Sequence, residues 1–215
     1  ASHNTAVGRD ALAANTTGGQ NTAVGSLALD ANTTGHRNTA VGQEALTKNT
    51  TGDNNISIGH YSMGSNTSGV GNVAVGMYAL DANTTANYNT AIGYQSLSAS
   101  TTASALVAVG YNALAANTTG TNNTAVGYEA LDACTTGAQN EAFGRSALTS
   151  NTTGGYNTAI GHEALMSATT ADNNLAIGYL ASRSSTIGNN NIAVGREALY
   201  TNVAADRNVA IGYRS

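Results

Sequence analysis

Asn21-Thr22-Ala23-Val24-Gly25 specifies the fold of this chain, because the pentapeptide returns along all 215 residues at a fixed 17-residue step. It recurs as Asn38-Thr39-Ala40-Val41-Gly42 and as Asn123-Thr124-Ala125-Val126-Gly127. The full unit reads N-T-A-V-G-x-x-A-L-x-x-N-T-T-G-x-x, and no insertion shifts its register. A fixed period of this size is typical of solenoids, propellers and arrays. We predict one continuous array over residues 1–215, with 13 repeats that start at Asn4, Asn21, Asn38 and so on.

The pattern within one repeat favours a parallel β-solenoid. Side chains alternate along a strand, so Thr22 and Val24 share one face and Ala23 takes the other. The Val24 column is apolar in every repeat and the Ala23 column is always small. We interpret the Val24 column as the inside of a stacked coil, with the Leu29 column as the second wall of the core. The Ala23 column is then an outer surface against which something packs closely.

Glycine marks the expected corners of each coil. Only glycine enters φ > 0 conformations freely, so the unbroken Gly25 column predicts a sharp corner in every repeat. The column comprises Gly8, Gly25, Gly42, Gly59, Gly76, Gly93, Gly110, Gly127, Gly144, Gly161, Gly178, Gly195 and Gly212. A second, less demanding corner is expected in the Gly18 column, where alanine replaces glycine in some repeats.

The fold class that follows is all-β, a parallel β-solenoid or β-roll of about 12.5 coils of the 17-residue unit. A helical repeat fits less well, because the unit is too short for two helices and Asn-Thr-Thr-Gly is poor helix material. Coils about 4.8 Å apart would give a rod of about 60 Å. Stacking would also turn the Asn21 and Thr16 columns into hydrogen-bonded ladders of amides and hydroxyls.

The pentapeptide resembles the N-S-V-A-I-G coil motif in the heads of trimeric autotransporter adhesins. Thr22, Ala23, Val24 and Gly25 fall on the V, A, I and G of that motif. The longer unit is similar to the N-T-A-[VI]-G-Y-x-A-L-x-x-N-T-T-G arrays of phage tail-fibre-like proteins. The resemblance covers the whole chain and implies a left-handed parallel roll assembled as a trimer. The extra Asn-Thr-Thr-Gly segment departs from the adhesin motif and leaves attachment and partner open.

The residues that could carry chemistry lie in columns rather than in one converging set, so we predict that the chain is not an enzyme. The four histidines are scattered, Cys134 is the only cysteine, and Asp30, Asp81 and Asp132 are three coils apart, so no metal or cofactor is expected. A net charge of −4 with eight Lys and Arg argues against nucleic-acid binding. No apolar run approaches the roughly 20 residues of a membrane span, so no membrane insertion is expected.

One column predicts a contact surface for sugars or protein. The residue after each repeat glycine is Tyr, Arg or His from Tyr94 onward, and amphipathic rings and guanidinium groups are common at interfaces. The alternative is a cross-coil ladder that only shields the corner. The candidate binding residues are Tyr94, Tyr111, Tyr128, Arg145, His162, Tyr179 and Arg196.

These observations favour a structural and adhesive fibre segment, a rigid rod outside the cell or on a virion. Its expected partners are copies of itself, as a homotrimer or an end-to-end filament, and a glycan or protein receptor. An ice-binding solenoid is an alternative, because the Thr16-Thr17 pair recurs in nearly every coil. A polysaccharide-binding or polysaccharide-cleaving solenoid is another. The receptor, the handedness of the coil, and a viral or bacterial origin stay open.

Three local features carry further expectations. Phe143 should widen its coil as the largest residue of the core column, while Glu141 on the same face reaches solvent or a neighbouring chain. In a glycosylating host, the Asn-x-Ser/Thr sequons, among them Asn15, Asn32 and Asn83, would be surface acceptors. Neither terminal coil carries a charged or bulky cap, so we expect flanking sequence or end-to-end stacking rather than an isolated particle.

Overall fold

The chain is an all-β parallel solenoid, described over residues 3–215 of a computed structural model. It divides into two compact units, Ala1–Leu106 and Val107–Ser215. The strands of the first unit are β1 (Thr5–Val7), β2 (Thr22–Val24), β3 (Thr39–Val41), β4 (Ile56–Ile58), β5 (Val73–Val75) and β6 (Thr90–Ile92). Those of the second are β7 (Val107–Val109), β8 (Thr124–Val126), β9 (Glu141–Phe143), β10 (Thr158–Ile160), β11 (Leu175–Ile177), β12 (Ile192–Val194) and β13 (Val209–Ile211).

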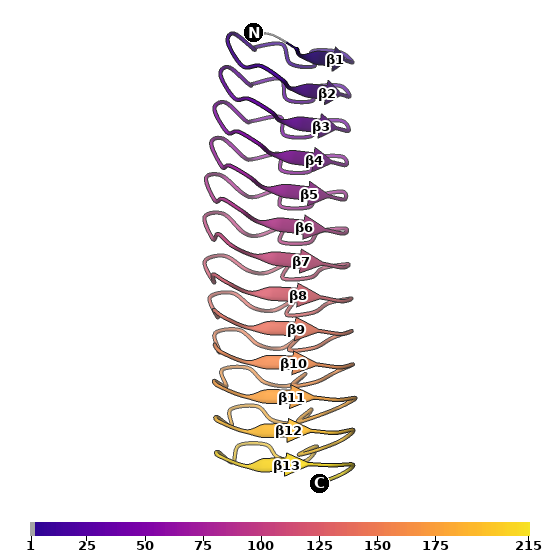
Figure 1. Cartoon of the computed structure of the whole chain (residues 1–215), viewed down its shortest axis with the longest axis vertical. Coiled ribbons are helices and arrows are strands. Elements are labelled where there is room, and N and C mark those ends of the chain that lie inside the picture. Colours follow the sequence, from indigo (N-terminus) through magenta and orange to yellow (C-terminus); the bar gives the residue numbers. More distant parts are fainter. Residues whose placement is uncertain (1–2) are drawn as a thin grey trace. The chain divides into compact units, whose positions relative to one another are not determined.

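Each coil contributes one three-residue strand, and the rest of the coil consists of turns and bends. Within each unit the strands stack in chain order (Figure 1). Neighbouring strands join residues one repeat apart in parallel register, as Thr22, Ala23 and Val24 do with Thr39, Ala40 and Val41. The fold class and the coil length predicted from the sequence are therefore confirmed.

The predicted facing of the strands is wrong. Ala23 and Ala40 are fully buried, whereas Val24 is 36% exposed, so the alanine column lies inside the coil and the valine column outside. The Leu29 column is buried as predicted, and the Ala28 column is buried beside it. The interior is thus filled by leucine together with small residues. The narrow space explains why the alanine column never admits a large side chain.

The glycine corner is confirmed, and φ lies between 129° and 142° at all 13 positions, as with 138° at Gly25. A side chain would also collide there, because a Cβ on Gly25 would lie 2.4 Å from the carbonyl oxygen of Gly42. The sequence does not reveal three further positions per coil at which non-glycine residues adopt positive φ, such as Gln20, Leu27 and Leu29. Left-handed backbone costs about 1 kcal/mol or more per L-residue, so burial and inter-coil hydrogen bonds must offset it.

Space rather than conformation favours glycine in the Gly18 column. These glycines are not at positive φ, but a Cβ on Gly35 would lie 2.4 Å from Oδ1 of Asn32 and 2.5 Å from the oxygen of Gly52. Close approach of neighbouring coils therefore restricts the size of the residue. The second corner predicted here does not depend on glycine's backbone freedom.

Two buried asparagine ladders connect the coils, as predicted for the Asn21 column. In the first asparagine ladder, the Asn21 column, Asn21 Oδ1 accepts from the backbone N–H of Asn38 (2.9 Å) and Asn21 Nδ2 donates to the Gly35 carbonyl (2.8 Å). In the second asparagine ladder, the Asn32 column, the amides bond one another directly, as Asn49 Nδ2 does with Asn32 Oδ1 (3.0 Å). Both ladders satisfy polar groups that burial would otherwise leave unpaired.

The threonine column forms a different ladder from the one expected. Thr33 Oγ1 donates to the backbone carbonyl of Thr50 (3.1 Å), and Thr50 Oγ1 donates to that of Thr67 (3.0 Å). The bonds thus run from hydroxyl to carbonyl, because each hydroxyl lies beside the main chain of the next coil. The neighbouring Thr17 column is exposed, and both columns lie in bends rather than in a strand.

Phe143 does not lie in the core, so the predicted widening is wrong. It is 40% exposed on the outward side of β9, and that strand pairs with β8 and β10 in the ordinary register. Glu141 shares this face and is exposed to solvent, as expected, where it accepts a hydrogen bond from Thr158 Oγ1 (2.9 Å). The outward face accommodates a large ring because no opposite wall confines it.

Most of the sequons are not surface acceptors either. Asn32, Asn49 and Asn83 are fully buried in the second asparagine ladder, and Asn15 is partly buried. A glycan on such a side-chain nitrogen would displace the ladder. Asn122 is the exposed asparagine among the sequons of the described residues.

Candidate functional site

The column that follows the glycine corner forms a continuous row of side chains in the second unit. Six of the seven predicted binding residues lie there, one on each of six consecutive coils, and Tyr213 extends the row by one further coil. Tyr94, the seventh, belongs to the first unit. We call the row in the second unit the tyrosine–arginine ladder: Tyr111, Tyr128, Arg145, His162, Tyr179, Arg196 and Tyr213.

The side chains of the tyrosine–arginine ladder stack on one another. The rings of Tyr111 and Tyr128 are 5.1 Å apart with an interplanar angle of 9°, and Arg145 lies over Tyr128 at 5.7 Å. His162 and Tyr179 stack at 5.3 Å, and the Arg196 guanidinium lies 5.3 Å from the Tyr179 ring and 5.8 Å from that of Tyr213. The coil period thus brings into contact planar groups that are a full repeat apart in the sequence.

Carboxylates from the next sequence position line the ladder. Glu129 follows Tyr128 in the sequence, and hydrogen bonding to this carboxylate together with its charge raises the pKa of Tyr128. Glu163 accepts from Arg183 Nε (2.7 Å), which lowers the pKa of Glu163. Glu197 lies within 2.6 Å of Arg214 Nε and 3.1 Å of Arg196 Nε, and the Arg214 bond lowers the pKa of Glu197 most. The sequence places these glutamates beside the row but does not reveal Arg183 or Arg214 as their partners.

The same column is less regular in the first unit. His60 of this column contacts two tyrosines, lying 5.5 Å from the ring of Tyr78 at an interplanar angle of 87° and 6.2 Å from that of Tyr61. Tyr61 and Tyr78 occupy the position after the column, so the single-column pattern does not reveal this cluster. The rings there are tilted or edge-on rather than stacked.

The outward sheet face, formed by the Thr22 and Val24 columns, is the second candidate surface. Val24, Ile92 and Ile160 are 36%, 39% and 40% exposed although each lies within a sheet. Among the described residues of the two columns, Glu141 carries the single charge. The face consists almost entirely of Val, Ile and Thr.

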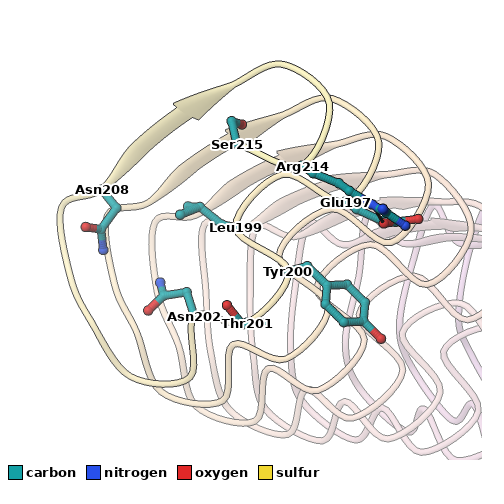
Figure 2. Close-up of a pocket in the computed structure, with 8 residues that line it drawn as sticks. All are labelled: Glu197, Leu199, Tyr200, Thr201, Asn202, Asn208, Arg214 and Ser215. Atoms are coloured by element: carbon teal, nitrogen blue, oxygen red, sulfur yellow. Dashed lines mark hydrogen bonds and ion pairs between the residues drawn. The ribbon is translucent and has the colours of Figure 1, made fainter.

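A cavity of about 530 Å³ opens at the last coil (Figure 2). Leu199 points into it, while Glu197 and Arg214 lie together at its rim (Figure 2). Leu199 belongs to the core column, and its N–H donates to the Ser215 carbonyl (3.0 Å). In the preceding coils the equivalent leucines, such as Leu148 and Leu165, are fully covered by the coil that follows. The cavity is therefore coil interior and not a separately built ligand site.

Three further features of the described residues concern metal ligands, the Cys134 thiol and membrane-spanning helices. Within residues 3–215 no three His, Cys, Asp or Glu side chains lie close enough to hold a metal ion together. Burial raises the pKa of Cys134 to about 11, so this thiol is neutral at physiological pH. In the same part of the chain, no helix is long and apolar enough to cross a bilayer.

No protein-family model, no curated protein and no solved structure matches this chain. The resemblance of the coil motif to adhesin heads and tail-fibre-like arrays therefore stays a prediction. The two surfaces described above are the features on which a function can be proposed.

Proposed function

We propose that this chain is a structural segment of a fibre at the surface of a cell or virion, in which copies of the solenoid associate through the outward sheet face. The observation that carries the proposal is the pair of outward columns, which present partly exposed Val, Ile and Thr side chains coil after coil. Large contiguous apolar patches on a protein surface mark interaction sites. A face of this regularity supports a role in assembly.

A second copy of the chain is the partner that fits this face best. Copies that lie side by side in parallel present identical side chains at identical heights, as closed rotational symmetry requires. A partner selected by charge would need a charge pattern, and Glu141 is the only charged residue of the described columns. Three copies around a common axis, the arrangement implied by the motif resemblance, would cover the face on each chain.

Light scattering of the purified chain tests this assembly. We expect the mass of a trimer, reduced to that of a monomer when Val109 and Val126 are both replaced by lysine. Lysine on neighbouring strands of the face would place two desolvated charges in the contact, each without a partner. The matched control is Thr119→Lys with Thr136→Lys, on exposed bends of the same two coils. A wild-type chain that remains monomeric at every concentration would refute the proposal.

A further inference from the structure

We infer that the tyrosine–arginine ladder of the second unit binds an extended neutral polysaccharide that runs along the ladder with one sugar per coil. Such a site rests on the proposed function as a surface fibre and gives that fibre a class of ligand. It uses a different surface from self-association, because the ladder follows the glycine corner and does not belong to the outward sheet face.

The spacing of the ladder matches the repeat of a sugar chain. Successive planar groups are 5.1 Å apart at Tyr111 and Tyr128 and 5.3 Å apart at His162 and Tyr179. An extended β-1,4-linked pyranose chain advances by close to this distance per sugar, so each coil meets one sugar. Successive sugars are turned by about half a turn, so their two hydroxyl-bearing edges face the ladder in alternation. A polypeptide in an extended strand presents one face only every two residues, about 6.7 Å, and loses register within a few coils.

The exposed parts of the ladder decide which chemical groups it can bind. Tyr128 lies between Tyr111 and Arg145, and Tyr179 lies between His162 and Arg196, so both ring faces are covered. These tyrosines nevertheless remain 45% and 47% exposed, through their edges and hydroxyls. The ladder therefore presents a row of tyrosine hydroxyls and ring edges to solvent. Nucleic-acid bases, which bind by stacking on free ring faces, are a poor match.

Charge balance selects a neutral polymer. The arginines of the ladder have carboxylates beside them: Arg196 and Arg214 pair with Glu197, and Arg145 lies in the field of Glu163. The row and its neighbours thus combine four arginines (Arg145, Arg183, Arg196 and Arg214) with three glutamates (Glu129, Glu163 and Glu197), so it offers both donors and acceptors at a small net charge. Sugar hydroxyls both donate and accept hydrogen bonds, so they can use both kinds of group. A polyanion would instead require unpaired cations along the row.

Isothermal titration with cellobiose, cellotetraose and cellohexaose tests the inference. We expect affinity to rise about tenfold or more from the shortest to the longest, because each added sugar engages another coil at high effective concentration. Tyr128→Ala and Tyr179→Ala should each weaken cellohexaose binding about three- to tenfold, the range expected for one lost hydrogen bond. Tyr156→Ala is the matched control, since Tyr156 is at least as exposed on the second unit but lies outside the ladder.

Three results would overturn the inference: no binding of any of these oligosaccharides, affinity that does not change with their length, or an equal loss in the Tyr156→Ala control. Stronger, salt-dependent binding of alginate would also overturn it, in favour of a polyanion site. Light scattering of the same variants separates this inference from the proposed assembly. Ladder variants should keep the wild-type mass, and sheet-face variants that become monomeric should still show the dependence on oligosaccharide length.

Discussion

The second asparagine ladder runs unbroken through most of the first unit but is interrupted repeatedly in the second. In the first unit, Asn32, Asn49, Asn66 and Asn83 each donate Nδ2 to the Oδ1 of the preceding asparagine, at 2.7 to 3.0 Å. In the second unit the column reads Asn117, Cys134, Asn151, Ala168, Ser185 and Asn202. Both units are thus built from the same type of backbone coil, but the polar residues in their interiors differ.

Where this column lacks an asparagine, the asparagine of the preceding coil loses the donor for its Oδ1. Oδ1 of Asn117 and of Asn151 have no hydrogen-bond partner, because Cys134 and Ala168 follow them in the column. Oδ1 of Asn83 is left unpaired in the same way where Ser100 follows it. An unsatisfied buried polar atom costs about 1 to 3 kcal/mol. We therefore expect local opening at lower free energy in the second unit, measurable by native-state hydrogen exchange.

We expect the largest effect from substitutions at the glycine corner, which test whether both units require positive φ at this position. Gly42→Ala in the first unit and Gly127→Ala in the second should each destabilise the fold by about 3 kcal/mol or more, because φ is 134° and 142° at these corners. The new Cβ would also lie 2.6 and 2.4 Å from the carbonyl oxygens of Gly59 and Gly144. Denaturant unfolding gives both values. A small effect at either corner would show that the coils are not equivalent.

Breaking the continuous ladder should have the next largest effect. Asn49→Ala removes the donor to Asn32 Oδ1 and Gly52 and the acceptor for Asn66 Nδ2. We expect a loss of about 2 to 3 kcal/mol in the free energy of unfolding, because three buried groups each lose a partner. Asn49→Asp is the control of similar size, and it should not restore stability, since a carboxylate cannot donate. A neutral Asn49→Ala variant would contradict the role of the ladder.

The equivalent substitution in the interrupted ladder, Asn151→Ala, should lower the free energy of unfolding by less. Asn151 Oδ1 already lacks a partner, and its Nδ2 donates to the Gly154 carbonyl (2.9 Å) with only a 4.0 Å contact to the Cys134 sulfur. Asn151→Ala should therefore cost about 1 kcal/mol. Equal losses for Asn49→Ala and Asn151→Ala in the same denaturant series would argue that amide-to-amide bonding adds nothing.

Repairing the ladder should stabilise the second unit. Cys134→Asn places an amide between Asn117 and Asn151, where it can donate to the unpaired Oδ1 of Asn117 and accept from Asn151 Nδ2. We expect a gain of about 1 kcal/mol, with slower hydrogen exchange in these coils. Cys134→Ser is the control, because a hydroxyl is too short to bridge neighbouring coils. No gain for Cys134→Asn would mean that the site cannot accept the larger side chain.

The smallest effect is a dependence on alkaline pH confined to the second unit. Burial raises the pKa of the Cys134 thiol from 9.0 to about 11, so between these values the unfolded chain releases a proton that the folded chain retains. Stability should therefore fall as pH rises above 9, by less than about 1 kcal/mol at pH 9.5. Cys134→Asn should lack this component when unfolding is measured across the same pH range. An identical pH profile in both proteins would exclude the thiol as its source.

The coil itself could be predicted from the amino-acid sequence. The exact 17-residue step predicted parallel in-register strands, the glycine corner and the stacked asparagines, because identical side chains recur at each level of a solenoid. It also located the row from Tyr111 to Arg196, since a column in the sequence becomes a row in space. Stacking of these rings follows from the same periodicity, whereas the pairing of Glu163 with Arg183 depends on how the turns between coils fold.

The inward face of the strand, in contrast, emerged only from packing in three dimensions. Alternation separates Ala23 from Thr22 and Val24 but does not say which side is buried, and the usual preference for large apolar cores favoured the valine column. The interior is too narrow for that choice, because Leu29 from the opposite wall and the small Ala28 column already fill it. The branched residues are therefore outside, on the face that we propose as the assembly surface, and the buried column holds only small residues, alanine and, at one position, Ser57.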